Sequence, residues 1–230
     1  MLTLAIDTAT KVCTAALCRQ RELLAEYTIN MGMTHSEGLL PQLEQLLART
    51  GTAKRDIGLL AVSMGPGSFT GLRIGLATAE AMAYSWQCCL HGVDTLKALA
   101  YNVPMEGMVL SPVLDAQKGN FYQALYQWQN GALQELAPVQ VVSGEKALER
   151  IALQEKPALL LGEGGRLAQK GLPDGVQLAP PALRMPRASS VALAALDEFD
   201  PEADKKIFGL EPYYIRRSEA EELWEKKQRQ

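Results

Sequence analysis

An apolar run without alternation, residues 57–63 (IGLLAVS), leads directly into a glycine-rich turn at residues 65–71 and then into a helical stretch from about Leu72 to Trp86. A strand that is apolar at every position is typical of a parallel strand covered on both faces. A further strand near residues 88–93 and a helix from Thr95 follow. This order predicts an α/β lobe built on a mixed sheet flanked by helices.

The residues before this apolar strand predict a β-meander and a helix. Residues 2–6, 12–17 and 22–29 look extended, with polar turns between them. Leucines then recur at helical spacing up to Gly51: Leu39, Leu40, Leu43, Leu46 and Leu47. Thr34 and Glu37 have capping-box spacing, but a helix that began there would place Pro41 past its first turn. We therefore expect a later start or a kink.

The second half of the sequence begins like the first. A predicted strand at residues 108–114 ends in Asp115, as the first strand ends in Asp7, and extended residues 121–128 follow a turn. This pattern indicates a duplicated lobe. Strands at 139–142 and 158–161 and helices at 144–154 and 189–199 complete the prediction. We expect an N-terminal lobe at 1–106, a smaller degenerate lobe at 107–217 and a charged tail at 218–230, either a solvated helix or disordered.

The composition is that of a globular protein with an overall acidic surface. Of 230 residues, 47% are hydrophobic and 21% are charged, and the net charge is −3, which argues against a chain whose whole surface attracts a polyanion. The four cysteines show neither CxxC spacing nor the density of a disulfide scaffold, which fits a reducing compartment. The N-terminal residues do not have the pattern of a signal peptide. No uncharged run approaches the roughly 20 residues that span a bilayer. We therefore expect a cytoplasmic protein.

The glycine-rich turn is the most informative local feature. Its glycines and the N–H groups at the following helix start form a candidate anion-binding loop, comprising Gly65, Gly67, Ser68 and Thr70. No Gly-Lys-Ser/Thr closes it, so it is not a Walker loop. A helix N-terminus contributes roughly 0.3–1 kcal/mol to an exposed anion, which alone would hold a nucleotide poorly. A tight strand-to-helix connection without a ligand remains the alternative.

The helix after this turn carries small residues four apart. Gly71, Gly75, Ala79 and Ala83 form one smooth ridge along which another element can approach closely. Glycine inside a helix costs roughly 0.5–1 kcal/mol relative to alanine, so close packing must compensate for Gly75. The ridge packs either onto the chain's own sheet or onto another subunit, and the sequence leaves both open.

Few residues have the spacing of a catalytic or metal site. The two histidines, His35 and His91, form no HxxxH pair, and no GxSxG elbow surrounds a serine. Aspartates at strand ends can face a crevice, which makes Asp7, Thr8 and Asp115 candidates for a vestigial site. Aspartates at turns also form Asx turns routinely. We therefore predict no catalytic residue and no metal ligand.

Several motifs, taken in order, resemble the TsaB (YeaZ) family over nearly the whole chain. They are Leu4–Thr10 (LAIDTAT), Thr34–Glu37 (THSE) before Leu40-Pro41, Gly65–Gly75 (GPGSFTGLRIG), Leu114–Ala116 (LDA) with Phe121-Tyr122, and Glu211–Arg216 (EPYYIR). The glycine-rich stretch is the most specific of them. The resemblance implies the actin-like, ribonuclease H-like fold of two similar lobes, which agrees with the two strand-plus-aspartate openings.

The resemblance also implies a role in threonylcarbamoyl transfer to the adenosine adjacent to the anticodon of tRNAs. In that family the chain is an inactive paralogue of TsaD, works with TsaD and the small ATPase TsaE, and forms its dimer contact through the helices at about 36–50 and 71–86. The residues then expected to bind a partner are Leu39, Leu43, Leu46, Gly71, Gly75, Ala79 and Ala83. A homodimer is expected when the partner is absent, and contact with tRNA is expected to be indirect or local.

Two departures from the relatives' patterns affect the expected chemistry. TsaD relatives bind metal through HxxxH, whereas residues 90–97 here contain only His91. The turn Asp7–Thr10 lacks the glycine by which actin-like ATPases admit a phosphate. We expect a non-catalytic scaffold without a cofactor of its own, with at most a weakly held adenine nucleotide at the interface with partners. The alternatives are an independent actin-like kinase or ATPase and a metallopeptidase-like enzyme.

Overall fold

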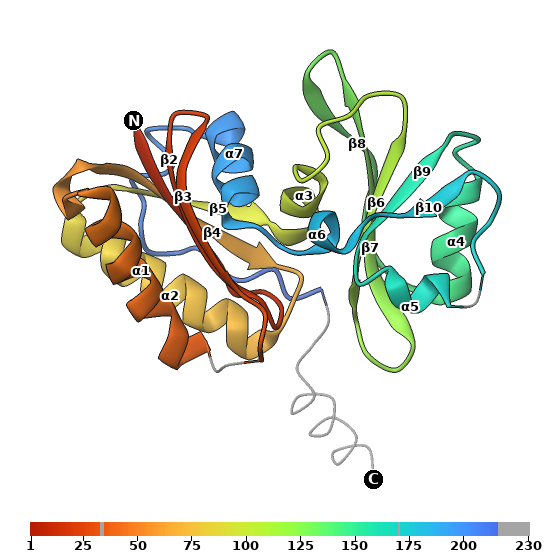
Figure 1. Cartoon of the computed structure of the whole chain (residues 1–230), viewed down its shortest axis with the longest axis horizontal. Helices are drawn as coiled ribbons and strands as arrows, with labels where there is room; N and C mark the ends of the chain where they lie inside the picture. The colour runs from red at the N-terminus through yellow and green to blue at the C-terminus, as the bar shows by residue number, and fades with distance from the viewer. Residues whose placement is uncertain (33–34, 170, 216–230) are drawn as a thin grey trace, which may run out of the picture.

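The chain folds into two lobes, each built on a five-stranded mixed sheet (Figure 1). The computed structural model describes residues 1–32, 35–169 and 171–215. The predicted α/β class is confirmed. The charged tail expected at 218–230 lies outside the described residues.

The first lobe has the strand order β3-β2-β1-β4-β5. Strands β1 to β3 are antiparallel neighbours, while β4 and β5 run parallel to β1. Helices α1 and α2 cover one face of this sheet (Figure 1). The elements are β1 (Leu2–Asp7), β2 (Cys13–Arg19), β3 (Glu22–Ile29), α1 (His35–Thr50), the 3₁₀ helix η1 (Lys54–Asp56), β4 (Ile57–Gly65), α2 (Phe69–Trp86) and β5 (Cys89–Asp94).

The second lobe repeats this topology, with the strand order β10-β9-β6-β7-β8. Again three antiparallel strands precede two that run parallel to the first of them, which confirms the predicted duplication. Helix α3 (Thr95–Ala100) connects the lobes. The remaining elements are β6 (Val109–Asp115), β7 (Asn120–Gln129), β8 (Ala132–Ser143), α4 (Gly144–Ala152), β9 (Ala158–Gly162), α5 (Gly165–Ala168), β10 (Val176–Leu178), α6 (Pro181–Arg184) and α7 (Ala188–Glu198).

After the second sheet the chain returns to the first lobe. Helix α7 packs against β1 and β2, on the face opposite α1 and α2, although the boundary expected from the sequence groups its residues with the second lobe. Val191 and Ala195 of α7 join one buried core with Ala5 of β1 and Leu110 of β6. Both lobes therefore share a hydrophobic core around α3 and α7.

Helix α1 begins earlier than expected and continues through Pro41. The prediction of a later start is wrong. Proline removes the N–H that would bond the carbonyl of Glu37, and both residues are exposed, so water can satisfy that carbonyl. Leu39, Leu43 and Leu46 are buried against the sheet, and this burial offsets the lost hydrogen bond.

Candidate functional site

A cleft of about 510 Å³ lies where the two lobes face each other. The glycine-rich loop and the β1–β2 turn form one wall, and the ends of β6 and β9 form the other. Residues 213 and 214 border it as well. Among the predicted site residues, the cleft brings together Gly67, Ser68, Thr70 and Asp115.

Asp7 is held inside the first lobe. Its side chain is 1% exposed and accepts hydrogen bonds from Ser63 Oγ at 2.5 Å and from the N–H of Ala9 at 2.9 Å. Burial raises the pKa of Asp7, and these two hydrogen bonds and the charge of His35 oppose the rise. The carboxylate thus closes the β1–β2 turn instead of facing the cleft, which gives it a structural role.

Thr8 is also buried, at 2% exposure, and joins this turn to α2. Its hydroxyl donates a hydrogen bond of 2.8 Å to the carbonyl of Gly71. Neither Asp7 nor Thr8 lines the cleft. The side chains of both residues instead point into the first lobe, and a vestigial site at Asp7 and Thr8 stays a prediction.

Asp115 does line the cleft, but its carboxylate already has partners. One oxygen accepts from the N–H of Gln117 at 2.8 Å in an Asx turn, and the other pairs with Arg166. The N–H of Asp115 donates to Glu163 at 2.6 Å. Arg166 therefore offsets part of the negative charge that Asp115 and Glu163 bring to this wall of the cleft.

The glycine-rich loop packs tightly onto the β1–β2 turn. A β-carbon at Gly67 would lie 2.3 Å from the carbonyl oxygen of Ala9, so no other residue fits there. The N–H of Ser68 donates to that same carbonyl at 2.6 Å, and Ser68 Oγ caps α2 by accepting from the N–H of Gly71 at 3.3 Å. Two backbone N–H groups that an anion would need are therefore already used.

The charges of the cleft do not match a polyphosphate, which needs cationic groups or free N–H groups. Asp115 and Glu163 line the cleft from the second lobe. Among the described residues, Lys11 is the one basic residue in the lining. Anion binding by Gly65, Gly67, Ser68 and Thr70 stays a prediction. The geometry favours the tight-connection alternative.

The small-residue ridge of α2 faces the chain's own sheet. Gly71, Gly75, Ala79 and Ala83 are all buried. A β-carbon at Gly71 would lie 2.1 Å from the carbonyl oxygen of Thr8, and one at Gly75 would lie 2.4 Å from Thr8 Oγ1. The ridge is therefore not a partner-binding surface, and the prediction that it contacts another subunit is wrong. Its glycines admit the β1–β2 turn.

The other predicted partner-binding residues are buried in the same way. Leu39, Leu43 and Leu46 are at most 3% exposed and pack in the core beneath α1. Leu39 and Leu46 mark the inner face of α1, and Leu43 lies at its edge, since it packs in the core and also lines the surface groove between α1 and α2. Helical periodicity cannot distinguish a face that packs on the chain's own core from one that packs on a partner.

The outer faces of α1 and α2 instead form an exposed apolar groove of about 630 Å³, which we call the α1–α2 groove. Leu40, 55% exposed, lies on the α1 side. A second small-residue stripe, comprising Ala77, Ala81 and Ser85, is exposed along α2. The groove residues are Leu40, Leu43, Glu44, Leu47, Ala48, Gly51, Thr52, Ala53, Lys54, Ala81, Met82, Ser85 and Trp86. The four-residue spacing of that stripe was the sequence signal for this surface.

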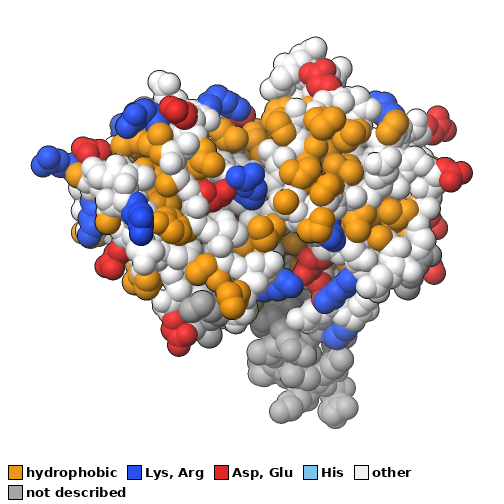
Figure 2. Space-filling model, viewed as in Figure 1, with side chains coloured by type: hydrophobic (Ala, Val, Ile, Leu, Met, Phe, Trp, Pro, Cys, Tyr) orange, Lys and Arg blue, Asp and Glu red, His pale blue; other side chains and the backbone are white. Residues whose placement is uncertain are grey.

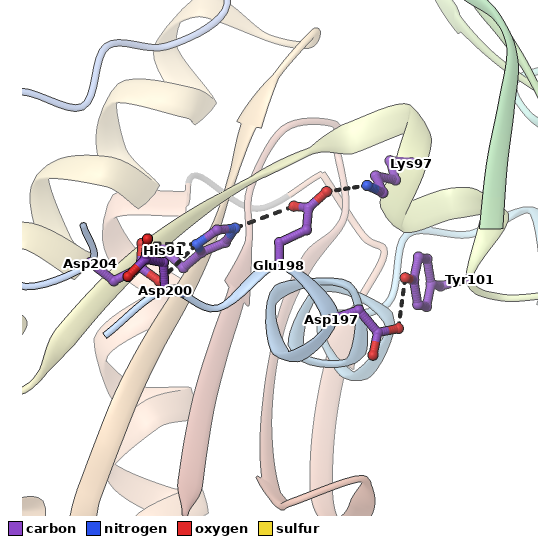
Figure 3. A network of polar contacts seen from close by, with 7 residues as sticks. All are labelled: His91, Lys97, Tyr101, Asp197, Glu198, Asp200 and Asp204. Atoms are coloured by element: carbon purple, nitrogen blue, oxygen red, sulfur yellow. Dashed lines mark hydrogen bonds and ion pairs between the residues drawn. The ribbon is translucent and has the colours of Figure 1, made fainter. Parts of the chain in front are cut away.

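His91 belongs to a polar network that ties the C-terminal segment to β5. Figure 3 shows its ring between Asp204 and Glu198, with Lys97 on the other side of Glu198. His91 Nδ1 is 2.9 Å from Asp204, His91 Nε2 is 3.2 Å from Glu198, and Lys97 also pairs with Glu198. Burial alone would lower the pKa of His91, but the hydrogen bonds and charges of both carboxylates outweigh it and raise that pKa.

His35 stabilises the start of α1. Its Nε2 lies 2.7 Å from the carbonyl oxygen of Thr10, across the β1–β2 turn. Within residues 1–32, 35–169 and 171–215, no group of three or more histidine, cysteine or acidic side chains has the arrangement of a metal site. Within these ranges, therefore, neither His35 nor His91 belongs to a metal site.

Sequence and structure comparisons relate the chain to tRNA-modification proteins. Residues 22–224 match the family model described as TsaD, tRNA N6-adenosine threonylcarbamoyltransferase. The chain is 35% identical to the tRNA threonylcarbamoyladenosine biosynthesis protein TsaB of Bacillus subtilis, covering 97% of this chain and 98% of that protein. It is 30% identical to TsaB of Escherichia coli, covering 98% of each.

The fold matches a solved structure of YeaZ from Pseudomonas aeruginosa with a TM-score of 0.75 and 25% identity, covering 93% of this chain and 99% of that one. Together with the duplicated sheet topology, this similarity identifies the fold as the actin-like, two-lobed α/β fold. No helix in the described part of the chain is both long and apolar enough to cross a membrane.

Proposed function

Because the chain belongs to the TsaB family of tRNA threonylcarbamoyladenosine biosynthesis proteins, we propose that it acts as a non-catalytic subunit that supports a TsaD partner in modifying tRNA. The main observation behind this proposal is the α1–α2 groove, which is an exposed apolar surface. The polar turn residues of the same lobe, Asp7 and Thr8, form hydrogen bonds within the lobe itself.

The groove has the properties of a protein interface. Its apolar wall, with Leu40, Met82 and Trp86, is bordered by Glu44 and Lys54, and an apolar centre with a polar rim is typical of such interfaces. The small side chains of Ala77, Ala81 and Ser85 let the backbone of a partner helix approach α2. We propose that TsaD occupies this groove and that a second copy of the chain occupies it when TsaD is absent.

A supporting role also agrees with the cleft. In this chain Asp7 and Thr8 hold the β1–β2 turn closed, so the carboxylate of Asp7 is bonded within its own lobe and does not face the cleft. We propose that TsaE joins the assembly, that contact with tRNA is indirect or local, and that any adenine nucleotide is held weakly at the boundary between subunits. On the face shown in Figure 2, acidic and basic side chains are scattered among hydrophobic ones. Such a surface is expected if partner proteins bind the tRNA.

The proposal is tested by reconstituting tRNA modification with and without this chain, using Ala81→Glu as the interface variant. Ala81 is exposed on α2, so the glutamate does not disturb the core, but it places a charge in the groove beside Glu44. We expect loss of TsaD association in a pull-down and loss of modified adenosine.

The matched control is Ala152→Glu, the same change at an exposed position of α4. It should leave both readouts at the wild-type level. Full association and modification by the Ala81→Glu variant would exclude the α1–α2 groove as the interface. Calorimetry of the isolated chain with ATP and magnesium should show no tight stoichiometric binding.

A further inference from the structure

A second pocket between the lobes, of about 450 Å³, lies beside α3. Tyr213 lines both this pocket and the cleft, so the C-terminal segment separates the two. Its lining comes from β4, β5, α3, β7, β8, α7 and the C-terminal segment, and comprises Met64, Gly65, Gly92, Asp94, Lys97, Tyr126, Glu135, Pro138, Val139, Glu198, Glu211 and Tyr213.

The pocket carries a surplus of negative charge. Four of its lining residues are acidic, namely Asp94, Glu135, Glu198 and Glu211, and one is basic, Lys97. Lys97 already pairs with Glu198. Within the described residues, Asp94, Glu135 and Glu211 form no ion pair, and Lys97 is the one cation near them, so the pocket keeps a surplus of negative charge.

Tyr126 points independently to a ligand. Its side chain is 3% exposed, lines the pocket and has no hydrogen-bond partner within the described ranges. It pairs in register with Glu135 across β7 and β8, which places both side chains on the same face of the sheet. Burial raises the pKa of Tyr126, and the charges of Asp94, Glu135 and Glu198 raise it further. The ring is buried in the core that the two lobes share, and the side chain lines the pocket with Asp94, Glu135 and Glu198, where its hydroxyl can bond to a ligand.

We propose that this pocket binds an ammonium or guanidinium group, held by Asp94, Glu135 and Glu211 and by the hydroxyl of Tyr126 as an additional acceptor. A metal ion requires carboxylate oxygens within about 2.0–2.6 Å of one point, and the described carboxylates form no such cluster. Acceptors spread around a pocket of about 450 Å³ instead match the several N–H donors of an organic cation.

Asp94 supports the same conclusion. One of its oxygens caps α3 by accepting from the N–H of Lys97 at 2.8 Å. Burial raises the pKa of Asp94 to about 6, against the effect of the backbone hydrogen bonds. A bound cation would favour the charged form of this carboxylate and offset its desolvation.

The test is calorimetric titration of the full chain with two probes, in buffer with about 0.15 M salt so that non-specific attraction is screened. Spermidine represents a free amine, and Nα-acetyl-L-arginine methylamide represents a side chain of a partner protein. We expect saturable binding of at least one probe at one site. Preference for spermidine would identify a free amine as the occupant, and preference for the arginine derivative a partner's side chain.

Tyr126→Phe and Glu135→Gln should each weaken binding by about tenfold, because the first removes an acceptor and the second removes a negative charge that faces the charged donor. Both retain the packing volume, and Glu135 is exposed, so thermal melts should resemble the wild type. Glu149→Gln, which removes the same charge from the exposed face of α4, is the control and should bind the probes normally. The proposal is overturned if neither probe binds, if both pocket variants bind as tightly as the wild type, or if MgCl2 binds there more tightly than either probe.

Discussion

Thr8 occupies the space that a side chain at position 75 would need: a β-carbon on Gly75 would lie 2.4 Å from Thr8 Oγ1. The same hydroxyl donates to the carbonyl of Gly71, one helical turn earlier. The glycines of α2 therefore let the β1–β2 turn pack directly on the helix backbone, and this contact holds α2 against the first sheet.

Gly75→Ala should destabilise the fold although alanine is the better helix former. The new methyl group overlaps Thr8 Oγ1 in a buried site, and overpacking of this kind costs about 1–3 kcal/mol. Urea denaturation measures the loss of unfolding free energy. Gly75→Leu should cost more still, so impaired TsaD binding by that variant would report misfolding instead of a lost interface.

A double-mutant cycle isolates the contact. In a Thr8→Ala background the hydroxyl is absent, so Gly75→Ala should cost less than in the wild type, with a coupling of about 1 kcal/mol. Equal costs in the two backgrounds would show that the steric contact with Thr8 does not determine the choice of glycine.

Glu26 of β3 attaches the start of α7 to the first sheet. One carboxylate oxygen accepts from Arg187 Nη2 at 2.7 Å, and the other accepts from the N–H and the hydroxyl of Ser189 at 2.8 and 2.7 Å. Its side chain is 11% exposed. Arg187 is 39% exposed and stays partly solvated, so loss of the Glu26 charge mainly weakens the hydrogen bonds that this buried carboxylate accepts.

Glu26→Gln should therefore lower the free energy of unfolding by about 1–2 kcal/mol, measured by urea denaturation. Glu22→Gln, on the exposed part of the same strand, is the matched control and should change it by less than about 0.5 kcal/mol. If both variants lose equal stability, the attachment of α7 does not depend on Glu26.

The His91 network should make stability depend on pH. The pKa of His91 is raised above 6.5, because hydrogen bonds and charges from Glu198 and Asp204 outweigh burial. The pKa of Glu198 is lowered below 4.5, by its hydrogen bond to His91 against the opposing effect of burial. The histidine contribution is complete below pH 6.5 and disappears as pH rises through the raised pKa. The glutamate contribution is complete above pH 4.5 and disappears as pH falls.

His91→Gln should accordingly destabilise the chain most between about pH 4.5 and 6.5 and least at about pH 9. Urea denaturation of both proteins across this range gives the difference at each pH. His35→Gln serves as a control for loss of a histidine elsewhere. A difference that stays constant from about pH 5 to pH 9 would contradict an imidazolium held between two carboxylates.

Most helices and strands could be predicted from local sequence patterns. The continuous apolar run at 57–63 forms strand β4 between β1 and β5, and the leucine spacing forms α1. The repeated opening of the two halves forms two sheets of equal topology. These features depend on the spacing of apolar residues that are close in the sequence, so they can be read from the sequence without the structure. Pro41 was the local exception, because whether a proline is tolerated depends on whether solvent reaches the freed carbonyl.

The candidate site was predicted less well. The small-residue spacing correctly indicated a closely approached helix, but both faces of α2 carry such a stripe, at Gly71–Gly75–Ala79–Ala83 and at Ala77–Ala81–Ser85. The inner stripe proved to be core. The acidic pocket was not predicted, since its residues come from seven elements far apart in the chain.

The amino-acid order alone was thus sufficient for the family, the fold class and the duplicated topology, because motif and periodicity are local properties. Only the folded arrangement decides that Asp7 and Thr8 point inward, that the α1–α2 groove and not the glycine ridge is exposed, and that Tyr126 lies among the carboxylates of an acidic pocket. Burial and charge surroundings arise from contacts between distant segments, and those contacts exist only once the two sheets and α7 have packed together.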